Sequence, residues 1–171
     1  QVLSSAASDV YKRQSIPFLL FGFGVVDSFF ESMSGITTTG ATVIAGLDDL
    51  PKSLLIYRQL LQWLGGMGLI VLAIAVMPLL GIGGGQLFKT QTPGPMSEQR
   101  LTPRITSTAR ALWSIYLFLT ILCIFAYRLA GMDYFDAVSH AFSTVSIGGF
   151  STHDLSIGFF DSISIEIVCM V

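Results

Sequence analysis

Residues 31–42 read ESMSGITTTGAT, a run of serine, threonine and glycine in a chain that is 52% apolar and only 12% charged. That balance is typical of membrane-embedded chains, in which lipid or neighbouring helices solvate each span. A stretch so rich in hydroxyl groups needs a physical reason to lie in such a chain.

Two segments are long and apolar enough to cross a bilayer. Residues 59–88 contain no charged side chain, and this length exceeds the ~20 residues that a spanning helix needs. Residues 111–127 are also uncharged and reach the lower end of the spanning range, with aromatic side chains near both ends. We therefore predict spanning helices over about 54–80 and about 105–130. The apolar run at 162–171 is predicted to begin a further span.

Two shorter apolar segments lie outside these spans. Each has about eleven residues, which as a helix would measure ~16 Å, or half the thickness of the hydrocarbon core. We predict re-entrant pore helices over about 27–36 and about 134–145. Asp27 and Asp136 are the predicted N-caps, because a carboxylate there bonds the free amides and faces the positive helix end.

The two segments also match each other in sequence. With Gly40 placed on Gly149, an offset of 109 residues, the aligned positions carry the same or similar side chains. The matched pairs are Asp27 and Asp136, Ser34 and Ser143, Ile36 and Val145, Thr37 and Ser146, and Thr42 and Ser151. We infer an internal repeat in which each unit is a span, a half-helix, a glycine-containing extended strand and a second span.

A strand of this kind has a use at membrane depth. Its carbonyl oxygens can replace the hydration shell of a monovalent cation, and glycine permits the positive φ that turns neighbouring carbonyls the same way. The predicted filter strands are Thr37, Thr38, Thr39 and Gly40, and Ser146, Ile147, Gly148 and Gly149. The side chains expected to support them from the half-helices are Glu31, Ser34, His140 and Ser143.

The chain closely resembles the TrkH-type potassium-uptake proteins of the Trk/Ktr/HKT superfamily. The resemblance runs from about Ser15 to the C-terminus, whereas residues 1–14 fall outside it and are expected to be a disordered or artefactual leader. The segments that carry it are FFESMSGITTTGATV, RQLLQWLGGMGLIVLAIAVMPLLG, TPGPM, LTPRI, ALWSIYL and HAFSTVSIGGFSTHD.

The resemblance implies an all-α membrane protein with four repeats of helix, re-entrant pore helix, filter strand and helix around one ion path. This chain would hold two incomplete repeats, 15–88 and 105–171, with Gly40 and Gly149 as the signature glycines. The implied ion is K⁺, with Na⁺ as the alternative, and the flux is either channel-like or coupled to H⁺ or Na⁺. No cofactor, further metal or catalytic residue is implied. A homodimer and a cytosolic nucleotide-binding regulatory subunit of the TrkA type are implied.

The charges suggest an orientation. Residues 89–104 carry three basic side chains against one acid, and by the positive-inside rule this link is cytoplasmic while the filter loops face outside. We expect the protein to lie in the bacterial cytoplasmic (inner) membrane. Arg58, at the outer start of its helix, is expected to reach the interface or to pair with Asp48 or Asp49.

Other classes of function have less support in the sequence. No basic run indicates nucleic-acid binding, and Cys123 and Cys169 lie in apolar runs as expected of reduced thiols. Gly65, Gly66 and Gly68 are interpreted as sites of close helix packing. A helical packing protein without a pore would need neither filter glycine. An intramembrane serine hydrolase would use Ser143, His140, His153 and Asp154, which lie closer in sequence than triad residues usually do.

Overall fold

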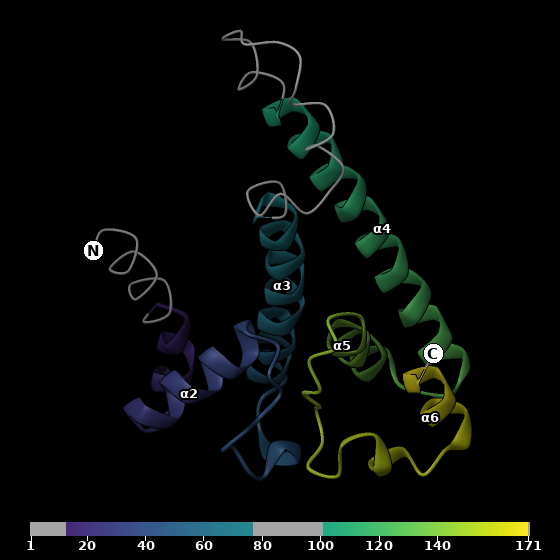
Figure 1. The fold of residues 1–171 in the computed structure, drawn as a ribbon. Helices are drawn as coiled ribbons and strands as arrows, with labels where there is room; N and C mark the ends of the chain where they lie inside the picture. Colours follow the sequence, from purple (N-terminus) through teal and green to yellow (C-terminus); the bar gives the residue numbers. More distant parts are fainter. Residues whose placement is uncertain (1–12, 77–100, 171) are drawn as a thin grey trace, which may run out of the picture.

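The computed structural model describes residues 13–76 and 101–170, which form helices joined by loops (Figure 1). Residues 13–20 are helical, and the elements after them are α2 (Val25–Ile36), η1 (Leu47–Asp49), α3 (Lys52–Val76), α4 (Leu101–Leu129), α5 (Tyr134–Val145), η3 (Ser156–Phe160) and α6 (Ile163–Met170). The predicted all-α class is confirmed for this part of the chain.

The two long helices lie where the spans are predicted. Within α3 and α4, Lys52–Ala73 and Ser107–Leu129 are long and apolar enough to cross a membrane. α3 begins two residues before its predicted start, and residues 77–80 of the prediction lie outside the described residues. α4 begins at Leu101, so the last four residues of the predicted link are helical, and residues 89–100 also lie outside the described part.

The half-helices α2 and α5 lie across the long helices, with α3 between them (Figure 1). α2 packs on α3, whereas α5 packs on both α3 and α4. Because α3 belongs to the first repeat and α5 to the second, the two repeats share an interface along α3. α5 has the predicted bounds, and α2 begins two residues earlier than predicted.

The predicted N-caps are wrong. The caps are Gly24 for α2 and Asp133 for α5, and neither makes a side-chain capping hydrogen bond. Asp27 and Asp136 lie three residues further on, in the first turn, where a carboxylate still faces the positive end of the helix. In α5, Asp133 and Asp136 both fit the preference for an acid at the start of a helix, so the sequence alone did not show which of them is the cap.

Glycines on α3 allow the C-terminal ends of both half-helices to approach α3 closely. A Cβ atom at Gly65 would lie 2.0 Å from the carbonyl oxygen of Ile36, and one at Gly66 would lie 2.9 Å from the Cβ of Ser146. The packing role expected for these two glycines is therefore seen. It is not seen for Gly68, where an added Cβ would meet no described atom within 4 Å.

We expect Gly65→Ala to lower the stability of the purified full-length protein by about 1–3 kcal/mol, the usual cost of overpacking. The added methyl group would push on the last residue of α2, directly before the first strand. Gly68→Ala is the matched control, since it adds the same group to the same helix without a described contact. Thermal unfolding in detergent measures the difference. Equal melting temperatures for the two variants would contradict the packing role.

Candidate functional site

The two half-helices end in the same way. The amide of Thr39 donates to the carbonyl of Ser34 at 3.0 Å, and the amide of Gly148 donates to the carbonyl of Ser143 at 2.8 Å. Both are the six-residue bonds that close a helix before the chain turns away. The donors and the acceptors are each 109 residues apart, so the repeat inferred from the sequence is present in the backbone.

Both strands contain the same pair of left-handed residues. Thr38 and Ile147 have φ of 55° and 57°, and Gly40 and Gly149 have φ of 75° and 84°. Glycine accepts this conformation readily, whereas it is strained for a β-branched residue. Strained backbone of this kind persists where the surrounding structure enforces it, and it concentrates at functional sites. Each strand therefore has the irregular backbone expected of a filter.

A polar side chain of each half-helix holds the chain just beyond each strand. The Thr42 hydroxyl donates to Glu31 Oε1 at 2.9 Å, and His140 Nε2 lies 2.9 Å from the Ser151 hydroxyl. Each hydroxyl oxygen also accepts from the amide two residues further on, at 3.1 Å in both repeats. Glu31 and His140 are buried. They occupy equivalent places behind the two strands, although one is an acid and the other an imidazole.

The two serines predicted as supports are buried, and they differ in their contacts. The Ser34 hydroxyl donates to the carbonyl of Ala41 at 2.5 Å, which ties α2 to the residue after Gly40. Ser143 lines a cavity of about 260 Å³ together with Ile147 and Gly149. The Ser34 side chain therefore holds the residue after the first strand, whereas the Ser143 side chain shares a cavity with residues of the second strand.

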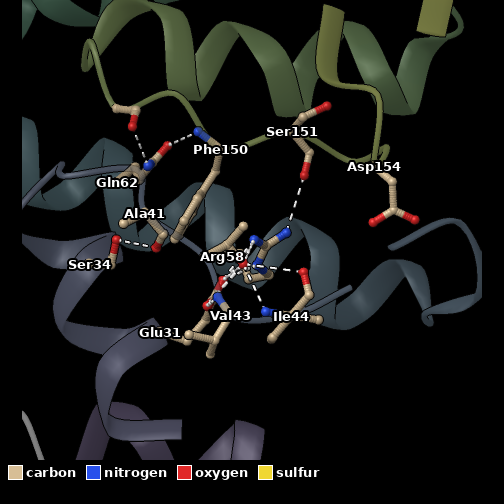
Figure 2. Close-up of polar contacts among 12 residues, drawn as sticks. Glu31, Ser34, Ala41, Val43, Ile44, Arg58, Gln62, Phe150, Ser151 and Asp154 are labelled. Carbon is tan, nitrogen blue, oxygen red and sulfur yellow. Dashed lines mark hydrogen bonds and ion pairs between the residues drawn. The ribbon is translucent and has the colours of Figure 1, made fainter. Parts of the chain in front are cut away.

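Arg58 joins the two repeats and does not pair with Asp48 or Asp49, so that prediction is wrong. Its guanidinium is buried in an ion pair with Glu31, with Nη2 at 2.7 Å from Oε1 (Figure 2). It also donates to the Thr42 hydroxyl at 3.1 Å and to the carbonyl of Ser151 at 3.2 Å. One side chain of α3 thus holds the residues that follow both strands.

Gln62 lies one turn further along α3 and was not singled out as a site residue from the sequence. Its Nε2 donates to the carbonyl of Gly148 at 2.8 Å, and its Oε1 accepts from the amide of Phe150 at 3.1 Å (Figure 2). The available signal was the four-residue spacing of Arg58 and Gln62, which places two polar side chains on one face of a mostly apolar helix.

The loops that follow the two strands are also joined to each other. The Asp154 carboxylate accepts from the amides of Gly46 and Leu47, each at 3.0 Å. The His153 ring bonds through Nδ1 to the carboxylate of Asp48. This hydrogen bond is the main reason that the pKa of Asp48 is lowered. His153 and Asp154 therefore join the loops that follow the two strands.

The lowered pKa of Asp48 gives a pH dependence with a defined sign. A carboxyl group whose pKa falls on folding adds stability above its unfolded pKa, and that stability is lost as pH drops through the folded pKa. We expect Asp48→Asn to flatten the acid side of the stability curve, below about pH 4. Melting temperatures between pH 3 and pH 7 measure this, with Asp49→Asn as the control. If the melting temperatures of Asp48→Asn fall as steeply below about pH 4 as those of the unmodified protein, the contact between Asp48 and His153 is contradicted.

Other chemistry has less support in the described part of the chain. No group of three or more His, Cys, Asp or Glu side chains in residues 13–76 and 101–170 is placed to hold a metal ion. Of the residues that a hydrolase would use, His140 contacts Ser151 instead of Ser143, and Asp154 bonds backbone amides. Cys123 and Cys169 are free thiols, as expected.

The sequence model of a family described as "TrkH: Cation transport protein" matches residues 5–171. The chain belongs to the TrkH family. The match includes residues 5–14, so the expectation that the resemblance starts at about Ser15 is corrected. Gln14 is also in contact with the first repeat, because its carbonyl accepts from the Tyr57 hydroxyl at 2.8 Å.

Relatives in the TrkH family agree over most of the chain. The Trk system potassium uptake protein TrkH of Vibrio parahaemolyticus is 60% identical over 160 residues, which cover 92% of this chain and 33% of that protein. The protein of the same name from Escherichia coli K12 is 56% identical over 147 residues, 86% of this chain and 30% of that one. This chain thus spans about a third of the length of these relatives.

A solved structure in the TrkH family has the same fold. The crystal structure of the potassium transporter TrkH from Vibrio parahaemolyticus matches with a TM-score of 0.78 and 56% sequence identity. The match covers 93% of this chain and 31% of that one. The helical architecture of this chain is therefore that of about a third of a TrkH protein.

Proposed function

We propose that this chain supplies two walls of a filter through which the whole protein imports K⁺ into the bacterial cell. The walls are residues 37–40 and 146–149. Relatives that are 55–60% identical are named as potassium uptake proteins, which supports K⁺ as the ion. The observation that carries the proposal is the repeated backbone, in which a half-helix is followed by left-handed residues at Thr38 and Gly40 and again at Ile147 and Gly149.

In this proposal the ion loses water and binds backbone and hydroxyl oxygens. The first strand offers three threonine hydroxyls in addition to its carbonyls, whereas the second offers one serine hydroxyl and two glycines. The two walls are thus chemically different, and this asymmetry is compatible with some passage of Na⁺. The C-terminal, negative ends of α2 and α5 lead into the strands and favour a cation there.

The side chains behind the strands hold them in shape. Glu31 and His140 fix the hydroxyls of Thr42 and Ser151, and Ser34 fixes the carbonyl of Ala41. Ser143 belongs to this group because its carbonyl accepts the bond that closes α5. Bracing of this kind is needed because irregular backbone at membrane depth is stable only where its polar groups have partners.

The orientation, partners and assembly follow from charge and family. We place the filter loops outside the cytoplasmic membrane and residues 89–104 inside, by the positive-inside rule. A TrkA-type nucleotide-binding subunit on the cytoplasmic side and a homodimer are the assembly that the family resemblance implies. The transported ion is the only ligand required, and no cofactor or enzymatic step forms part of this function.

Growth at low K⁺ tests the proposal. A chimera is made in which this chain replaces the matching third of Vibrio parahaemolyticus TrkH, and it is expressed in cells without K⁺ uptake systems. We expect growth at submillimolar K⁺ and uptake of ⁸⁶Rb⁺ that is reduced by competing K⁺. The unmodified Vibrio protein is the positive control. A chimera that reaches the membrane but restores neither would favour a helical packing protein without a pore.

A further inference from the structure

The side-chain amide of Gln62 spans the signature glycine of the second strand. Its donor end bonds the residue before Gly149, and its acceptor end bonds the residue after it, at 2.8 and 3.1 Å. The Gln62 amide thus makes the two hydrogen bonds that the backbone of a neighbouring strand would make to Gly148 and Phe150. Gln62 has no exposed surface, so both bonds form out of contact with solvent.

The fit around the Gly148 carbonyl is tight on two sides. A Cβ atom at Gly148 would lie 2.3 Å from Cδ of Gln62, so the amide touches the backbone of the strand. A Cβ atom at Gly40 would lie 2.0 Å from the Gly148 carbonyl oxygen, so that oxygen also lies against the first strand. The carbonyl of Gly148 is thus held between α3 and the first strand.

The equivalent carbonyl in the first strand, 109 residues earlier, belongs to Thr39. No described side chain donates a hydrogen bond to it. The two walls therefore differ in more than side chains. One has a carbonyl that is free of protein donors in the described part of the chain, and the other has its carbonyl bonded to α3.

We propose that Gln62 is a positioning residue that sets K⁺ selectivity by holding the Gly148 carbonyl toward α3 and away from the ion path. This inference rests on the proposed function and adds to it a selectivity determinant outside the filter strands. A carbonyl released from Gln62 turns into the path and changes the number of oxygens around the ion. The number and field of the coordinating oxygens distinguish K⁺ from Na⁺.

The matched pair Gln62→Met and Gln59→Met tests this role in the chimera. Both substitutions replace a fully buried glutamine of α3 with an unbranched side chain of similar length, and Gln59 makes no side-chain hydrogen bond among the described residues. We expect Gln62→Met to lower the ratio of K⁺ to Na⁺ uptake by about three- to tenfold, the effect of losing the buried hydrogen bond to the Gly148 carbonyl. Gln59→Met should leave the ratio unchanged.

A second pair breaks the same contact from the strand. Gly148→Ala displaces the Gln62 amide without changing that side chain, whereas Gly158→Ala adds a methyl group where no described atom lies within 4 Å. We expect Gly148→Ala, but not Gly158→Ala, to lower the ratio. The double variant Gln62→Met with Gly148→Ala should be no less selective than the worse single variant, because both act on one contact.

The outcomes separate the two proposals. A chimera without substitutions that imports no K⁺ contradicts the proposed function. Import by the chimera with equal selectivity in Gln62→Met and Gln59→Met contradicts the role of Gln62 and leaves the proposed function intact. If Gln62→Met does not reach the membrane, the comparison of Gly148→Ala with Gly158→Ala decides, and equal selectivity of those two overturns the inference.

Discussion

Gly40→Ala is expected to reduce K⁺ uptake by the chimera more than a hundredfold. Gly40 has φ of 75°, which costs a residue with a Cβ about 1 kcal/mol or more. The added Cβ would also lie 2.0 Å from the carbonyl oxygen of Gly148, and neither strand can yield without moving its bonded neighbours. The two strands would be forced apart, and both proposed walls of the ion path would change together.

Gly46→Ala separates the clash from the backbone strain. Gly46 has φ of 76°, almost the same as Gly40, but an added Cβ there would meet no described atom within 4 Å. We expect a modest loss of stability, about 1 kcal/mol, and uptake close to that of the unmodified chimera. Initial rates of ⁸⁶Rb⁺ uptake, corrected for the amount of protein in the membrane, measure both variants. Similar rates would show that contact between the strands does not matter.

Removing one partner of the Glu31–Arg58 pair should be the most destabilising polar change in the described part of the chain. Both side chains are fully buried. Arg58→Met therefore leaves the Glu31 carboxylate without a counter-ion, and Glu31→Met leaves the Arg58 guanidinium without one. Breaking a buried pair in this way costs about 3–5 kcal/mol. Arg58→Met also removes the donors that hold Thr42 and Ser151.

The double variant and a control on the same helix make this prediction specific. Glu31→Met with Arg58→Met should recover part of the lost stability, because no charge remains buried, but uptake should stay low because Thr42 and Ser151 have lost their donor. Lys52→Met removes a cation from the exposed start of α3, where the ammonium lies 5.1 Å from the centroid of the Phe135 ring, and should lower stability by about 1 kcal/mol or less. Thermal unfolding in detergent gives the comparison. An Arg58→Met protein as stable as Lys52→Met would refute the buried pair.

The repeat and the elements around it could be predicted because they depend on local patterns. Two half-span segments with matching hydroxyl and glycine positions predicted α2, α5 and both strands, and the positive φ at Gly40 and Gly149 agrees with the reason given for glycine there. The left-handed conformation of Thr38 and Ile147 was not predicted, since β-branched residues seldom adopt it.

The side chains that join the repeats could not be predicted in the same way. Arg58 selects Glu31, 27 residues earlier, over the nearer Asp48 and Asp49, and this choice depends on how α2 packs against α3. Gln62 bonds a carbonyl 86 residues further along the chain. Long-range partners of this kind are set by the contact between α3 and the second repeat, which no local pattern describes.

We infer that residues 37–40 and 146–149 line one ion path. The most direct test is a crystal structure of the chimera grown with Tl⁺ in place of K⁺, because Tl⁺ is located by its anomalous scattering. We predict an anomalous peak between the two strands, within coordination distance of their carbonyl oxygens. An ordered filter with no Tl⁺ between these strands, or with Tl⁺ bound only elsewhere, would contradict the account.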